Sequence, residues 1–199
     1  MKKVLSTLVA IVLVVVFLVG FKIDYVTYME GARYISYLLT PATVCLAVPL
    51  YQQFSLLKKN AKAVLLGIAA GVLASLTVIL AMSILFHLDH TMYVTLLPKS
   101  ITTAIGIGVS EELGGIQSLT VVVIIITGVL GNIFAELICK VFRITDPIAQ
   151  GVGIGTSTHA VGTARAMEMG EIQGAMSGLS IVVAGLMTVV VANLFAGFY

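Results

Sequence analysis

The 199-residue sequence has few charged residues, only two cysteines, four prolines and no tryptophan. Charged side chains account for 10% of the residues and hydrophobic ones for 59%, a balance that excludes an ordinary soluble globular domain. Both cysteines, Cys45 and Cys139, lie within apolar segments, which argues against a disulfide framework. Without tryptophan, an aromatic belt at the membrane surface depends on tyrosine and phenylalanine. These shortages indicate a protein that crosses a membrane several times.

Motifs for nucleotide, metal or nucleophile chemistry are also missing. The pattern Gly-x-Gly-x-Gly at 151–155 follows no predicted strand and matches neither a P-loop nor a dinucleotide fingerprint. Two histidines and an aspartate in the short loop 87–90 are a weak metal-ligand signal, and no serine has the setting of a hydrolase nucleophile. We therefore expect no enzyme activity, no cofactor, no metal site and no nucleic-acid partner.

The apolar residues fall into long runs, and a run of about 20 residues is enough for one helix across a bilayer. We predict an all-α polytopic membrane protein with about seven membrane segments, in which residues 1–199 form one membrane domain in the cell's inner (plasma) membrane. The segments are 4–21, 34–54, 63–86, 93–110, 116–139, the polar stretch 151–168 and 174–198. The first run exceeds the apolar core of a secretory signal and no small-residue cleavage site follows, so we expect it to be retained.

Basic residues between the segments predict an orientation. The positive-inside rule assigns Lys2 and Lys3, the cluster 58–62, and Lys140 with Arg143 to the cytoplasmic side. Segment 93–110 must then begin and end on the opposite side, which predicts a re-entrant segment or a pair of half-helices. Residues 22–33 are expected to form a short loop.

Several segments contain residues that interrupt a helix, since proline removes a backbone donor and kinks the chain. The residues expected at these discontinuities are Pro41, Thr43, Pro49, Pro98, Gly106, Gly155 and Gly162. Membrane depth tolerates irregular backbone only where it is buried in protein or lines a water-filled cavity. The interrupted segments are therefore expected to line a site for a small solute.

The second half of the sequence contains an internal repeat. At an offset of 56 residues, segments 102–125 and 158–181 share eight identities, including Glu-x-Gly-x-Ile-Gln at 112–117 and at 168–173. We predict two repeat units, about 93–142 and 147–198, each with an interrupted segment, an acidic glycine-rich turn and a long apolar helix. Paired interrupted segments in two related halves indicate a transporter binding site.

Hydroxyl groups and two cations gather in these two interrupted segments. Half-helix N-termini expose unpaired N–H groups that favour anions, so we expect a site for a small carboxylate anion. Its expected residues are Lys99, Ser100, Thr102, Thr103, Thr156, Ser157, Thr158, His159, Thr163 and Arg165.

Each charged or titratable candidate also has a structural interpretation. Arg165 lies three residues before Glu168 on one helix face, so a structural ion pair accounts for it as well as a substrate contact does. Lys99 could instead extend to the membrane interface. His159 could be a satisfied interior histidine, or it could couple transport to protons because it titrates near neutral pH. Coupling to a proton or to another cation stays open.

Three motifs resemble the LrgB/CidB family. They are LPKSITT at 97–103 with SEELGGI at 110–116, GTSTHAVGTARA at 155–166, and TPAT at 40–43 with AVPLY at 47–51. The resemblance covers the chain from about residue 30 onward. Two features depart from the family pattern: Ala104 stands where many relatives have proline, and relatives commonly carry a further apolar segment before the first one here, so the chain is expected to be short at its N-terminus.

The resemblance implies two competing functions. In one, the protein acts with a small LrgA/CidA-type membrane partner as a holin/antiholin-like regulator of murein hydrolase activity and cell lysis. In the other, it transports small monocarboxylates, as a plastid relative translocates glycolate and glycerate and bacterial pairs are linked to pyruvate. Repeated broken helices lined with hydroxyls favour the transport function. Whether the protein forms a homo-oligomer is left open.

Overall fold

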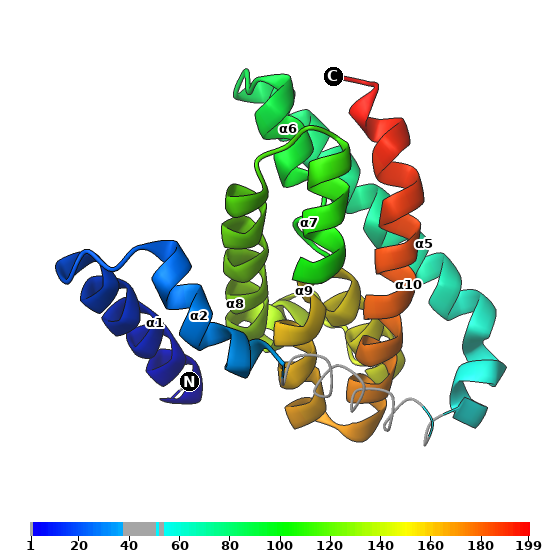
Figure 1. The fold of residues 1–199 in the computed structure, drawn as a ribbon. Helices are drawn as coiled ribbons and strands as arrows, with labels where there is room; N and C mark the ends of the chain where they lie inside the picture. The colour runs from blue at the N-terminus through cyan, green and yellow to red at the C-terminus, as the bar shows by residue number, and fades with distance from the viewer. Residues whose placement is uncertain (1, 38–50, 52–53) are drawn as a thin grey trace. The chain divides into compact units, whose positions relative to one another are not determined.

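The computed structural model describes residues 2–37, 51 and 54–199, and within these ranges every regular element is an α-helix (Figure 1). The chain divides into two compact units, residues 1–48 and 49–199. The helices of the first unit are α1 (Lys2–Gly20) and α2 (Tyr25–Ser36); those of the second are α5 (Phe54–Leu85), α6 (His90–Leu96), α7 (Thr103–Glu112), α8 (Gln117–Val141), α9 (Pro147–Met169) and α10 (Glu171–Ala196).

In the first unit, α1 covers most of the predicted first membrane segment. The loop predicted over residues 22–33 is wrong for most of its length, because α2 begins at Tyr25. The carboxylate of Asp24 accepts the backbone N–H of Thr27 at 2.8 Å and so caps the start of this helix. Pro41, Thr43 and Pro49, predicted at a discontinuity, lie outside the described residues.

Three helices of the second unit are long and apolar enough to cross a membrane. They are α5 from Lys58 to Leu85, α8 and α10, with 28, 25 and 26 residues. An apolar helix of this length satisfies all its internal backbone groups, as the bilayer core requires. The predicted class, an all-α membrane protein, is therefore confirmed, whereas the number of seven segments stays a prediction.

Helices α6 and α7 form a hairpin around a break at Pro98. Helix α6 ends at Leu96 and α7 begins after its N-cap residue Thr102. After the break the chain comes back beside α6, because the backbone N–H of Ile116, just after α7, donates to Thr95 Oγ1 in α6 at 2.8 Å. Segment 93–110 thus consists of two short helices joined at a break, while its re-entrant placement in the membrane stays a prediction.

Helix α9 forms a second hairpin, with its break at His159. This residue has φ 44° and ψ −145°, so it leaves the helical path between two helical arms. Both arms pack on the start of α10: a Cβ added to Gly155 in the first arm would collide with the Ser177 backbone, and Thr163 in the second arm bonds the Ser177 hydroxyl at 2.7 Å. The break lies between Gly155 and Gly162, and both glycines serve close packing inside the arms.

The two hairpins enter the second unit from opposite ends. The hydroxyl of Tyr199, after α10, donates to the Leu88 carbonyl beside α6 at 2.6 Å, so α10 finishes at the end where α8 begins. Helices α8 and α10 therefore run antiparallel (Figure 1).

The tips of the hairpins converge on Ile124 in the first half of α8. A Cβ added to Gly106 of α7 would lie 2.5 Å from Ile124 Cδ1. The Ile124 carbonyl lies 2.9 Å from His159 Nε2. Each hairpin is followed by a glycine-containing turn and a long apolar helix, so the element order agrees with the predicted repeat, which itself stays a prediction.

Candidate functional site

A small cavity with hydroxyl side chains in its wall lies where the first hairpin break meets α5, α9 and α10. Its volume is about 10 Å³, and four hydroxyl side chains contribute to its wall: Ser75, Ser100, Thr156 and Thr188. The lining also includes apolar side chains such as Leu97 and Ile101. A space of this size accommodates about one water molecule. The cavity brings together one predicted site residue from each interrupted segment, Ser100 and Thr156.

Thr156 is the clearest anomaly at this site. Only 5% of the residue is exposed, and its Oγ1 atom has no hydrogen-bond partner in the described part of the chain. Leaving a buried hydroxyl unpaired costs about 1–3 kcal/mol. Its methyl group is held in place by Gly71 of α5, where an added Cβ would lie 2.7 Å from Thr156 Cγ2. The hydroxyl thus lies at the cavity without a protein partner among the described residues.

Lys99 supplies a positive charge beside the cavity. Its ammonium group donates to Ser100 Oγ at 3.1 Å, and Ser100 Oγ is also 3.1 Å from Ser75 Oγ. Lys99 is half-buried, and no carboxylate among the described residues forms an ion pair with it. A half-buried cation without a counter-ion is a favourable place for an anion, because charge removed from water gains from an opposite charge nearby.

The remaining predicted hydroxyls are used within their own helices or lie outside the cavity wall. Ser157 Oγ donates to the Gly153 carbonyl at 2.7 Å, Thr158 Oγ1 to the Ile154 carbonyl at 2.6 Å, and Thr163 Oγ1 to the His159 carbonyl at 2.9 Å. Thr102 and Thr103 are half-buried at the start of α7, and the Thr102 side chain makes no capping bond. The Thr102 hydroxyl therefore accepts no hydrogen bond from the backbone N–H groups in the first turn of α7.

His159 has a structural position in this conformation. It is 4% exposed, and its Nε2 atom pairs with the Ile124 carbonyl at 2.9 Å. Since a carbonyl only accepts, Nε2 carries the hydrogen. A matching contact comes from Asn132, whose amide donates to the Val161 carbonyl at 2.8 Å. Together these bonds hold the tip of the α9 hairpin against α8.

Arg165 lies in a different cluster from Ser100 and Thr156. It lines a separate cleft of about 840 Å³ at the base of the α9 hairpin. There its guanidinium pairs with Glu168 at 2.9 Å and with Glu136 of α8, while Glu136 also binds Lys140 at 3.0 Å. The sequence interpretation of Arg165 and Lys99 as parts of one anion site therefore needs correction: the structure gives Arg165 two carboxylate partners and places it outside the small cavity.

Three residues that matter to this geometry escaped the sequence interpretation. Ser75 and Thr188 lie in conventional apolar helices and carry no local signal, because only packing brings them to the cavity. Glu136 did carry a signal, since an acidic residue within an apolar span is by default a functional candidate. In the part of the chain that is described, no group of three or more histidine, cysteine, aspartate or glutamate side chains could hold a metal ion.

Comparison with known proteins identifies relatives over nearly the whole chain. The model of the LrgB-like family matches residues 2–198. An antiholin-like protein LrgB of Bacillus subtilis is 37% identical over 187 residues, which cover 94% of this chain and 81% of that protein. A protein of the same name from Bacillus mycoides is 38% identical over 190 residues, covering 96% and 83%. No solved structure matches.

Proposed function

We propose, from the premise that this chain belongs to the LrgB-like family, that it is a membrane carrier of small monocarboxylates of the pyruvate or glycolate type. The observation that carries this proposal is the meeting of two oppositely directed hairpins at a buried cavity whose wall includes four hydroxyl side chains. Discontinuous helices whose ends meet inside the membrane are the usual setting of a transporter's substrate site.

The chemistry around the cavity suits a carboxylate. Lys99 supplies an ammonium group without a carboxylate partner among the described residues, and Thr156 supplies an unpaired hydroxyl. Helix α7 begins two residues after the cavity residue Ile101, and its N-terminal end carries partial positive charge. We assign one carboxylate oxygen to Lys99 and Ser100, and the other to Thr156.

The cavity of about 10 Å³ is too small for any monocarboxylate. In this proposal the described conformation is therefore the closed form, and binding requires the two hairpins to separate. A hydroxyl held unpaired in the closed form contributes strain that substrate binding relieves, since the carboxylate supplies the missing acceptor.

A second candidate function follows from the relatives' names. Proteins 37–38% identical to this chain are named antiholin-like, which favours a regulator of murein hydrolase activity and cell lysis that acts with an LrgA/CidA-type partner. That function needs no carboxylate site, so the two candidates differ in what they demand of Lys99. Lysis effects could also follow indirectly from a change in metabolite flux.

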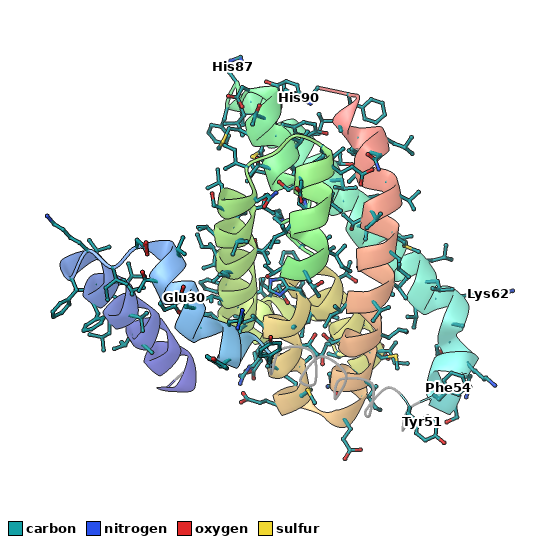
Figure 2. The ribbon with its side chains drawn as sticks, in the orientation of Figure 1. Glu30, Tyr51, Phe54, Lys62, His87 and His90 are labelled. Atoms are coloured by element: carbon teal, nitrogen blue, oxygen red, sulfur yellow. The ribbon has the colours of Figure 1, made fainter. Side chains whose placement is uncertain are left out.

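The deciding experiment uses purified protein in liposomes that contain a neutral dye. Uptake of labelled pyruvate, glycolate and lactate is measured for the wild-type protein, for Lys99→Ala and for the control Lys62→Ala. Lys62 is an exposed lysine of α5 (Figure 2). The carrier predicts saturable uptake without dye loss, abolished in Lys99→Ala and unchanged in the control. Dye loss, or full uptake in Lys99→Ala at equal insertion, would favour the antiholin-like function.

A further inference from the structure

The cleft of about 840 Å³ at the base of the α9 hairpin lies at the C-terminal end of the long apolar helix α8. This helix has 25 residues and is therefore about 38 Å long, at about 1.5 Å per residue. The hydrocarbon core of a bilayer is about 30 Å thick. The charged end of α8, with Lys140 and Arg143 in the wall of the cleft, therefore reaches the level of the lipid headgroups.

The cleft carries more positive than negative charge. Its wall contains three cationic side chains and two carboxylates, which belong to Lys140, Arg143, Arg165, Glu136 and Glu168. Arg165 pairs with both carboxylates, and Lys140 lies 3.0 Å from Glu136. Arg143 forms no ion pair with a carboxylate of the described residues. An anionic ligand would neutralise the excess positive charge of this wall.

The backbone keeps Arg143 in place beside the cleft. Its φ of 54° lies in the left-handed region that favours glycine. The N–H groups of Arg143 and Ile144 donate back to carbonyls in the last turn of α8 at 3.2 and 2.8 Å, which closes the helix end. The nearby carboxylate of Asp146 accepts the N–H of Ala149 at 2.8 Å and so caps the start of α9. The Arg143 guanidinium is thus the cation of the cleft that an outside anion can take as its partner.

Exposed apolar side chains lead along α8 to the same place. They are spaced alternately by four and three positions, so they form one stripe along the helix, and they are Ile126, Leu130, Ile133 and Leu137. The same spacing continues to Lys140, whose side chain is 73% exposed. A ligand with an anionic head and apolar chains would match both the cleft and this stripe, whereas a soluble anion would use the cleft alone.

We propose that the cleft binds the headgroup of an anionic phospholipid. The lipid phosphate lies against Arg143 and Lys140, and the acyl chains follow the stripe of α8. Basic pockets between membrane helices at headgroup level have the chemistry for such lipids, and the planar guanidinium of an arginine suits a phosphate. This lipid site does not depend on the proposed carrier, because it uses neither Lys99 nor the small cavity.

The test measures lipid binding to the purified full chain in a nonionic detergent by native mass spectrometry. The probe is dioleoyl-phosphatidylglycerol, with the zwitterionic dioleoyl-phosphatidylcholine for comparison. The wild-type protein should bind the anionic lipid more tightly. Arg143→Gln should weaken that binding about fivefold, the effect of one cation near a lipid surface, and leave the zwitterionic lipid unaffected. The matched control Lys62→Gln removes an exposed charge from α5 outside the cleft and should bind like the wild type.

A second variant and a soluble competitor complete the test. Arg143→Gly removes the same charge and suits φ 54°, so it should keep the fold and show the same fivefold loss even if Arg143→Gln folds poorly. Wild-type affinity in Arg143→Gly, or an equal loss in Lys62→Gln, would overturn the site. Glycerol 3-phosphate, which has the phosphate without acyl chains, should not displace the lipid; displacement at equal concentration would show a site for soluble anions instead. None of these results bears on uptake, so the carrier stands or falls separately.

Discussion

Replacement of Thr156 by valine should make the protein more stable and less active. Valine has nearly the same shape, so the contact of Cγ2 with Gly71 is kept while the unpaired hydroxyl is removed. An unsatisfied buried hydroxyl costs about 1–3 kcal/mol, and we expect the free energy of unfolding to rise by about that amount. Uptake should fall, because the hydroxyl assigned to one carboxylate oxygen is lost.

Thr158 provides the matched control for this prediction. It is also a buried threonine of α9, but its hydroxyl donates to the Ile154 carbonyl at 2.6 Å. Thr158→Val therefore removes a satisfied bond and should lower the free energy of unfolding by about 0.5–1.5 kcal/mol. The two substitutions, two residues apart and chemically identical, are predicted to change stability in opposite directions.

The assay combines unfolding of the purified protein in detergent with uptake by liposomes of equal protein content. Added carboxylate should stabilise the wild-type protein by mass action and stabilise Thr156→Val less. The reasoning is refuted if Thr156→Val is less stable than wild type, since the hydroxyl would then have a partner. It is also refuted if uptake by this variant keeps the wild-type KM and rate, since the hydroxyl would then be outside the site.

Two further predictions concern the α9 hairpin. Gly155→Ala should destabilise the protein by about 1–3 kcal/mol, because its Cβ would collide with the Ser177 backbone. Gly153→Ala should be neutral or stabilising, because a Cβ added there meets nothing within 4 Å. Equal effects of the two substitutions in thermal unfolding would contradict this packing. His159→Ala should lower the stability more than His159→Gly does, although both lose the bond to Ile124, because glycine alone adopts φ 44° without strain. Equal stability of the two variants in the same unfolding assay would contradict this prediction.

The sequence alone determined the class of the protein and the place of one break in its helices. Composition and run length require membrane helices, because a bilayer selects for apolar residues over a fixed distance. Pro98 located the first break correctly, since proline acts on its own backbone wherever it stands. The family was likewise recognisable from three motifs in order.

The position of the second break was beyond local reasoning. Gly155 and Gly162 are flexible residues, yet both lie inside helical arms, where the lack of a side chain lets another segment approach closely. His159 instead takes a φ of 44°, and its ring pairs with the Ile124 carbonyl on α8. That partner lies 35 residues away along the chain, and no local pattern encodes such a contact.

The grouping of the site residues was decided by tertiary structure alone. Lys99 and Arg165 look equivalent in the sequence, as cations in two related interrupted segments. Packing leaves Lys99 beside the small cavity without a carboxylate partner among the described residues, whereas it gives Arg165 the carboxylate of Glu136 from a neighbouring helix. The residue types and their order predict what kind of site the chain can build; which charges are neutralised depends on which helices meet, and that is a property of the fold.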